Sequence, residues 1–370
     1  MAEAAERPAG KLRHGWTTGA CATAATKAAY TALLTGVFPD PVLIELPKGQ
    51  RPTFALARAE LGGGQATAGI VKDAGDDPDV THGALILATV RPAAAGTGVR
   101  FTAGAGVGTV TKPGLPLAVG EPAINPVPRR MMREAVVDVA GQYGGTGDVL
   151  VEISVANGES LARHTWNPRL GILGGLSILG TTGIVVPYSC SAWIDSIRRG
   201  VDVARALGHR HVAACTGSTS EATVTALYGL PEDALLDMGD FAGAVLKYLR
   251  RYPIPLLTIA GGIGKLSKLG DGHLDLHSGR SQVDLERMAD AVAAAGGAPD
   301  TVAAVRSANT ALDALRRCEA GHFDLGGLVA ARALATAAKV LGDAPVRAEV
   351  VVIDRAGEVV GRAGDRPVSV

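Results

Sequence analysis

The sequence predicts an α+β domain over residues 1–187 and an α/β domain over residues 188–370. In the second part, an apolar run, a glycine-containing turn and a helix-forming segment follow one another three times, which is typical of a parallel α/β sheet. In the first part, short β-like runs surround isolated helices without that alternation. We therefore expect an α+β amino-terminal domain followed by a Rossmann-like carboxyl-terminal domain with a mostly parallel sheet.

The first domain opens with a predicted helix that begins at Thr17 or Thr18 and ends before Gly36. A threonine can cap the first turn, and a glycine can take the left-handed conformation that closes the last one. Small side chains recur at every fourth position from Ala20 to Ala28, which favours a close-packed core helix. The threonines could instead bind an anion through the amino end of the helix.

The rest of the first domain reads as short strands with one more helix. The strands are expected at Val42–Leu46, Thr53–Glu60, Ala66–Val71, Ala84–Val90 and Val149–Val155, and the helix at Arg129–Ala140. Asn157-Gly158 then predicts a tight hairpin turn.

The stretch from Gly171 to Pro187 carries no charge, and five of its 17 residues are glycine. An apolar run should be buried, yet each glycine weakens a core element by roughly 0.5–1 kcal/mol relative to alanine. We expect bare backbone to be needed here, either by a close-packed neighbour or by a bound ligand.

The second domain alternates helices and strands. Helices are expected at Ala192–Leu207, Thr219–Tyr228, Phe241–Arg251, Leu285–Ala295 and Leu325–Val340, and strands at His211–Cys215, Ala234–Asp237, Pro255–Ile259 and Arg347–Ile353.

Composition excludes several classes of protein. The 36 basic and 36 acidic residues cancel, and aromatic residues make up 4% of the chain, so neither a basic field nor a base-stacking surface indicates nucleic-acid binding. The four cysteines form no Cys-x-x-Cys pair, which favours reduced thiols in the cytoplasm over disulfides or zinc. The glycine-broken run at 171–187 is too short to span a membrane. A homo-oligomer is compatible with these properties.

In an open parallel sheet, ligands bind beyond the carboxyl ends of the strands. Three such ends are rich in glycine, and Asp237 follows Gly217 by twenty residues, where an acid that binds a ribose hydroxyl is expected. The alternative is that the glycines only form tight turns. The candidate cofactor-binding residues are Thr216, Gly217, Asp237, Gly239, Gly261, Gly262 and Gly264.

Two other motifs are incomplete. Gly264-Lys265 lacks the first glycine and the final Ser or Thr of a P-loop, which argues against ATP hydrolysis. His273 and His277 have the spacing of a zinc helix, but the expected glutamate is missing. This segment could bind metal, line an active site or form a plain surface loop, and we expect no metal site.

An acidic loop and several arginines complete the candidates. The segment from Lys72 to His82 contains four aspartates, which either form turns in a solvated loop or wall a site where Asp73 or His82 moves a proton. Arginines around a cleft can bind carboxylates with two hydrogen bonds each, although paired arginines such as Arg129 and Arg130 are usually surface residues.

Several long blocks of the chain resemble the family of cobalt-precorrin-5B C(1)-methyltransferases of anaerobic cobalamin biosynthesis. The resemblance runs from about residue 12 to 350, and its blocks lie at 12–21, 71–81, 106–115, 120–129, 167–171, 180–185 and 262–266, with His273 and His277-Ser278. It implies methyl transfer from S-adenosylmethionine to C-1 of a cobalt-containing tetrapyrrole. Ala105 stands where an acid is expected between Gly104 and Gly106, so we assign no acid to that loop.

This resemblance suggests a division of labour between the two domains. The α/β domain would hold S-adenosylmethionine, and the α+β domain would hold the carboxylates of the tetrapyrrole, with the glycine run between them. Candidate substrate-binding residues are Lys72, Arg129, Arg130, Arg169, Thr181, Thr182 and Lys265, and candidate catalytic residues are Asp73, His82 and His277.

Two other classes of protein fit the same residues. One is an NAD(P)-dependent oxidoreductase that uses the α/β domain, and the other is a non-catalytic tetrapyrrole carrier with a vestigial nucleotide fold. Incubation with S-adenosylmethionine followed by mass spectrometry of the macrocycle separates them, because only the methyltransferase adds a methyl group.

Overall fold

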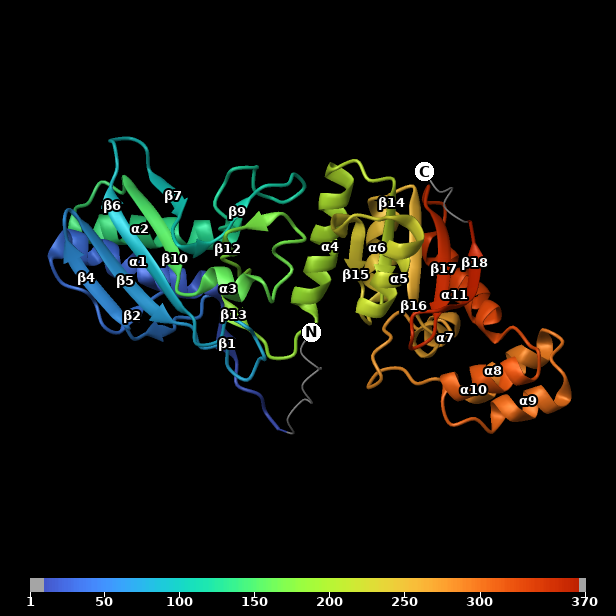
Figure 1. Ribbon diagram of the computed structural model, residues 1–370. Coiled ribbons are helices and arrows are strands. Elements are labelled where there is room, and N and C mark those ends of the chain that lie inside the picture. Colours follow the sequence, from blue (N-terminus) through green and yellow to red (C-terminus); the bar gives the residue numbers. More distant parts are fainter. Residues whose placement is uncertain (1–9, 366–370) are drawn as a thin grey trace. The chain divides into compact units, whose positions relative to one another are not determined.

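The first of two structural units, which ends at Cys190, is built on a five-stranded sheet (Figure 1). The computed structural model describes residues 10–365. The strand order is β4 (Arg58–Gly62), β5 (Gln65–Val71), β6 (Leu85–Pro92), β10 (Val149–Val155) and β7 (Val99–Ala103). All neighbours are antiparallel except β10 and β7, so this unit has the predicted α+β architecture.

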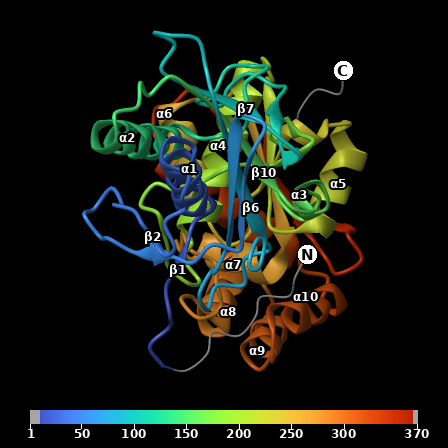
Figure 2. The ribbon, with the colours of Figure 1, turned by 90° about the vertical axis from the view of Figure 1, so that its left-hand side faces the viewer.

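Two long helices, α1 (Thr18–Thr35) and α2 (Pro126–Tyr143), lie on the same side of this sheet (Figure 2). The Thr17 hydroxyl accepts a hydrogen bond from the amide of Ala20 at 3.2 Å, and Gly36 closes α1 in the left-handed conformation, as predicted. The alanines of α1 are fully buried, which allows α1 to approach both α2 and the strands closely. The two threonines at its start are used for capping and for bonds to Leu179.

Four pairs of two-residue strands complete the unit: β1 (Gly15–Trp16) with β13 (Ile184–Val185), β2 (Val42–Leu43) with β3 (Thr53–Phe54), β8 (Gly106–Val107) with β12 (Gly175–Leu176), and β9 (Thr109–Val110) with β11 (Ile172–Leu173).

The glycine run at 171–187 therefore packs against earlier segments of the same unit. A Cβ at Gly175 would lie 2.2 Å from the carbonyl carbon of Gly106, and one at Gly180 would lie 2.3 Å from the hydroxyl of Thr17. Of the two explanations for bare backbone, close packing accounts for Gly171, Gly175, Gly180 and Gly183. Gly174 would meet no atom within 4 Å, and its φ of +86° explains that glycine instead.

The predicted hairpin at Asn157-Gly158 is wrong. Asn157 does adopt a positive φ of 56°, but the chain continues into a short helix, α3 (Gly158–Ala162). Both edges of β10 are already paired, with β6 and β7, so no strand following it could join there.

The second unit, from Ser191 onward, contains a five-stranded, mostly parallel sheet, as predicted. Its order is β15 (Leu235–Asp237), β14 (His211–Cys215), β16 (Leu256–Gly262), β17 (Arg347–Ile353) and β18 (Val359–Gly364). Only β18 runs antiparallel to its neighbour.

Helices cover both faces of this sheet. The larger core includes side chains from α4 (Ser191–Ala206), α6 (Ala242–Arg251), α7 (Ile263–Gly270) and α11 (Leu325–Leu341). A smaller core joins α5 (Ser218–Tyr228) to Cys215 and Ala260. A 3₁₀ turn at Glu232–Ala234 precedes β15, and α8 (Leu285–Ala294), α9 (Pro299–Arg306) and α10 (Ala311–Ala320) lie between α7 and α11 in the chain.

Candidate functional site

The carboxyl edge of the second sheet contains a topological switch point. The neighbouring strands β14 and β16 are followed by α5 and α7, whose side chains belong to different cores. The two connections thus leave toward opposite faces of the sheet, and ligands in open α/β sheets bind in the crevice where this happens. The sequence-predicted residues Thr216, Gly217 and 261–264 lie at this point.

Lys265 contacts two of the loops at this edge of the sheet. Its Nζ lies 3.1 Å from the carbonyl oxygen of Thr216 and 3.1 Å from Oδ1 of Asp240. The amide of Thr216 donates to the carbonyl of Ala260 at 3.0 Å. Residues that follow β14, β15 and β16 are thereby held in one cluster, and Asp240 is a member that we did not predict.

The glycines at this edge fall into two groups. A Cβ at Gly261 would lie 2.6 Å from the Thr216 side chain, and Gly239 has a φ of +54° beneath Trp193, so packing and conformation explain both. A Cβ at Gly217, Gly262 or Gly264 would meet no atom within 4 Å. Packing does not require these three glycines, and their backbone faces open space that a ligand could fill.

Asp237 lies at the end of β15 and is 9% exposed. Its backbone carbonyl accepts a hydrogen bond from Nε1 of Trp193 at 3.0 Å, and the amides of the next two residues donate to the carbonyl of Cys215. The loop after β15 is therefore fixed against β14 and α4, with Asp237 at the carboxyl edge of the sheet.

Asp73 and His82 come together in the first unit, with 3.9 Å between Oδ1 and Nδ1. Hydrogen bonds from Arg13 and from the amide of Gly75 lower the pKa of Asp73 to about 2. Asp73 is thus a carboxylate at neutral pH and cannot donate a proton there. His82 accepts a hydrogen bond at Nδ1 from the amide of Ala74 at 3.1 Å.

The third catalytic candidate, His277, belongs to the second unit and is exposed. Its Nδ1 accepts a hydrogen bond from the amide of Gly279 at 3.1 Å. The segment between α7 and α8 is not helical, so His273 and His277 do not share a helix face. Within residues 10–365, no group of three or more His, Cys, Asp or Glu side chains is arranged to hold a metal ion.

Two predicted substrate-binding cations are used inside the first unit. Lys72, with 1% of its side chain exposed, lies 2.6 Å from Asp79. Burial alone would raise the pKa of Asp79, but the charge of Lys72 and hydrogen bonds from Lys72 and Thr81 outweigh it and lower the pKa. Arg129 donates to Glu121 and to the carbonyls of two neighbouring residues at 2.7–3.0 Å.

The other predicted substrate-binding residues of this unit are more accessible. Arg130 and Thr181 are exposed, and Arg169 lies over the ring of Trp166 at 4.9 Å from its centroid. The hydroxyl of Thr182 lies 3.3 Å from both the amide and the carbonyl of Ile184.

Comparison of the sequence with known proteins identifies its family. The CbiD family profile matches residues 5–187, and that of the CbiD C-terminal domain matches residues 275–364. A protein of Paramagnetospirillum magneticum named cobalt-precorrin-5B C(1)-methyltransferase is 62% identical over 352 residues, which cover 95% of this chain and 98% of that protein. The chain belongs to the CbiD family.

Further relatives of this chain also carry CbiD-related names. The cobalt-precorrin-5B C(1)-methyltransferases of Rhodospirillum rubrum and Brucella anthropi are 61% and 60% identical over 353 residues, which cover 95% of this chain and 98% and 96% of theirs. The crystal structure of the cobalamin biosynthesis protein CbiD of Archaeoglobus fulgidus is 26% identical, with a TM-score of 0.39, covering 69% of this chain and 78% of that one. Within residues 10–365 of this CbiD chain, no helix has the length and apolar character that crossing a bilayer requires.

Proposed function

We propose that this CbiD-family chain transfers a methyl group from S-adenosylmethionine to C-1 of cobalt-precorrin-5B, giving cobalt-precorrin-6A. The observation that carries this proposal is the 60–62% identity to proteins named cobalt-precorrin-5B C(1)-methyltransferase, over 95% of this chain. A reaction in the cytoplasm is part of the proposal, because the four cysteines form no Cys-x-x-Cys pair, which favours reduced thiols.

The methyl donor is placed at the carboxyl edge of the second sheet. The open space beside Gly217, Gly262 and Gly264 supports this placement, because a ligand can approach the Cα atoms of these residues where a side chain would otherwise stand. In the proposal, Asp237 accepts a hydrogen bond from the ribose, and Lys265 holds the surrounding loops through Thr216 and Asp240. The donor supplies an electrophilic methyl group on a sulfonium.

The protein contributes mainly by positioning. The methyl transfer is an in-line displacement onto an electron-rich macrocycle carbon, and good alignment is worth up to roughly 7–11 kcal/mol. Proton transfer contributes on the order of 10²–10⁴-fold at most. The carboxylate of Asp73, His82 and the exposed His277 are the candidates for accepting a proton.

The predicted substrate-binding residues of the first unit form two groups, according to whether their side chains are available or are already paired inside the unit. Arg130, Arg169, Thr181 and Thr182 are the candidates for direct contact in the first unit. In the second unit, Lys265 is paired with Asp240 and is proposed to act on the substrate only through the loops that it holds. Lys72 and Arg129, whose cationic groups are paired inside the unit, are proposed to hold the loops that carry such contacts.

The decisive experiment incubates the purified chain with cobalt-precorrin-5B and S-adenosylmethionine and follows the macrocycle by mass spectrometry. The expected product is heavier by one methyl group and appears only with the donor present. An unchanged macrocycle, with the protein folded and the substrate bound, would contradict methyl transfer and leave a carrier role.

The variant Gly262→Ala tests the proposed binding site for S-adenosylmethionine separately from the reaction. Because an added Cβ meets no protein atom, the variant should keep the wild-type melting temperature yet bind S-adenosylmethionine roughly tenfold or more weakly, by calorimetry. Asp237→Asn should weaken donor binding as well. Gly141→Ala, at an exposed and equally open position of α2, is the matched control. Unchanged donor affinity in both site variants would remove the donor from this edge.

A further inference from the structure

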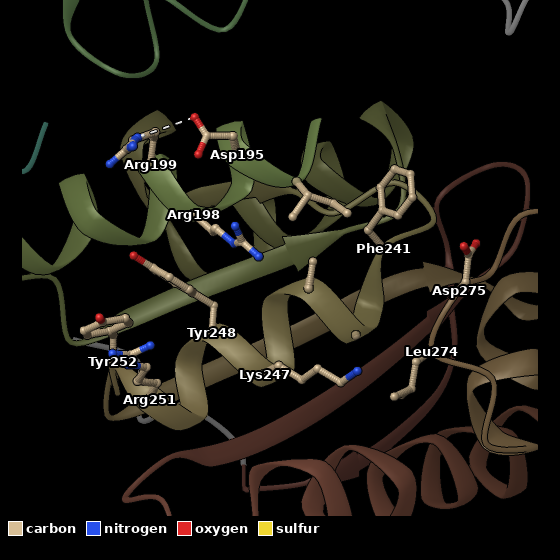
Figure 3. Close-up of a pocket in the computed structure, with 13 residues that line it drawn as sticks. Asp195, Arg198, Arg199, Phe241, Lys247, Tyr248, Arg251, Tyr252, Leu274 and Asp275 are labelled. Carbon is tan, nitrogen blue, oxygen red and sulfur yellow. Dashed lines mark ion pairs between the residues drawn. The ribbon is translucent and has the colours of Figure 1, made fainter. Parts of the chain in front are cut away.

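A groove of about 730 Å³ lies on the second unit between α4 and α6 (Figure 3). Residues of both helices line it, and Leu274 and Asp275 line the end near Phe241 (Figure 3). The α6 wall has 10 residues, so the groove follows a helix about 15 Å long. The candidate donor site does not use this groove, and of the sequence motifs only the segment from His273 to His277 reaches it, through Leu274 and Asp275.

The lining carries more positive than negative charge. Its cations are Arg198, Arg199, Lys247 and Arg251, and its acids are Asp195 and Asp275. Both acids already have cationic partners: Asp195 lies 3.6 Å from Arg199, and Asp275 lies 2.6 Å from Arg280.

Three of these cations have no acidic partner in the described part of the chain. Arg198, Lys247 and Arg251 form no ion pair with any residue in 10–365. Arg198 on α4 and Lys247 on α6 are both exposed, and Arg251 is the last residue of α6 (Figure 3). Three uncompensated cations along one groove favour a ligand with several negative groups.

Aromatic rings lie between these cations. Tyr248 and Tyr252 pack with centroids 4.7 Å apart, Arg198 lies 6.0 Å from the centre of Tyr248, and Arg251 lies 5.3 Å from that of Tyr252. Phe241 stands at the end of the groove opposite Tyr252, the same end as Leu274 and Asp275 (Figure 3). Ring faces bind flat conjugated surfaces, and guanidinium groups bind carboxylates with paired hydrogen bonds. A flat macrocycle with carboxylates on its rim combines both features.

The groove reaches the carboxyl edge of the sheet at Phe241. This ring packs edge-on against Trp193 with centroids 6.0 Å apart, and Trp193 donates to the carbonyl of Asp237. Phe241 also directly follows Asp240, the partner of Lys265. A ligand anchored in the groove would thus extend toward the edge where the donor is placed.

From these contacts we infer that the α4–α6 groove binds the peripheral carboxylates of the tetrapyrrole, with Arg198, Lys247 and Arg251 as their partners. This inference rests on the proposed function for the identity of the ligand. It gives the second unit a substrate anchor of its own, beside the contacts assigned to the first unit.

The test replaces the three cations with glutamine, singly and together, in the full chain. The stable octacarboxylate uroporphyrin serves as the binding probe, followed by its absorbance. We expect each replacement to weaken probe binding by roughly three- to tenfold and the triple variant by roughly 30- to 1000-fold. The KM for cobalt-precorrin-5B should rise in parallel, while kcat and the affinity for S-adenosylmethionine stay unchanged.

Arg250→Gln is the matched control, because Arg250 is an exposed cation on the same helix but does not line the groove. Circular dichroism and the melting temperature confirm folding of each variant. A triple variant that binds the probe and the substrate as Arg250→Gln does would overturn the groove assignment. Failure of the proposed function looks different: the wild-type chain adds no methyl group, whatever the probe affinities are.

Discussion

At the scale of single residues, the buried ion pair of Lys72 and Asp79 shows how a cation expected to bind substrate can serve the fold instead. A cationic side chain with 1% exposure is stable only with a partner, and Asp79 supplies it at 2.6 Å. The sequence shows the aspartates of this loop but not which of them faces the lysine, because that depends on how the loop turns back.

Lys72→Met should therefore lower the free energy of unfolding by about 3 kcal/mol, since it leaves the largely buried carboxylate of Asp79 without its counter-charge. Denaturation by urea measures the loss. The double variant Lys72→Met/Asp79→Asn should recover part of it. A double variant that is less stable than Lys72→Met would contradict this account.

His211 gives a pH-dependent contribution to stability. Burial lowers its pKa from 6.5 to about 4, and its Nε2 lies 2.8 Å from the hydroxyl of Thr258. Between these pKa values the unfolded chain binds a proton that the folded chain does not, so stability is full above pH 6.5 and falls as the pH decreases toward 4.

We expect the unfolding free energy of His211→Gln to fall less steeply than that of the wild type across this window. Urea titrations at a series of pH values test it. The carboxylate of Asp73, with a pKa of about 2, titrates below the window and does not obscure the result. Parallel curves for the two proteins would rule out His211 as the source.

At the scale of elements, a helix or strand can be predicted with correct bounds only where the sequence has a clear start signal and a clear stop signal for it. Strands His211–Cys215, Arg347–Ile353 and Val149–Val155 have the bounds that the sequence predicts, because each is a mostly β-branched or apolar run with a charged residue, glycine or proline within three residues of each end. Helix α7 was missed because it follows β16 without a loop. The two-residue strands were missed or misjudged because so short a segment has no period to detect.

The close contact between β8 and β12 predicts that adding one methyl group to a glycine at this contact lowers the stability of the fold. In Gly175→Ala, the new Cβ would lie 2.2 Å from backbone atoms of Gly106, so strand pairing must open and stability should fall by roughly 1–3 kcal/mol or more. Gly141→Ala, in the exposed part of α2, should instead gain up to about 1 kcal/mol. Thermal unfolding of both variants measures the difference, and equal melting temperatures would refute the close approach.

At the scale of the whole molecule, the site was predictable where topology alone determines it. Parallel strands place their carboxyl ends at one edge, so Thr216, Asp237 and Gly261 could be grouped from the sequence. The α4–α6 groove could not be predicted, because its walls are the outward faces of two helices separated by two strands and a helix. Hydrophobic periodicity in the sequence identifies the buried face of each helix. It does not tell which exposed helix faces lie next to each other in the fold.

Each unit has its own sheet and its own core, so each should fold without the other. We expect a fragment of residues 191–370 to show a cooperative thermal transition and to bind S-adenosylmethionine as tightly as the full chain. The fragment 1–190 should fold but not bind the donor. Donor binding by 1–190 and none by a folded 191–370 would reverse the proposed assignment.

The position of Trp193 has a practical consequence. The chain has three tryptophans, and Trp193 is the one that belongs to the second unit. Its indole touches both the end of β15 and the ring of Phe241 in the groove. In a 191–370 fragment, its intrinsic fluorescence would thus respond to occupancy at either place. A change in emission on adding the donor and a separate quenching by uroporphyrin would give two titrations from one native fluorophore, without any label.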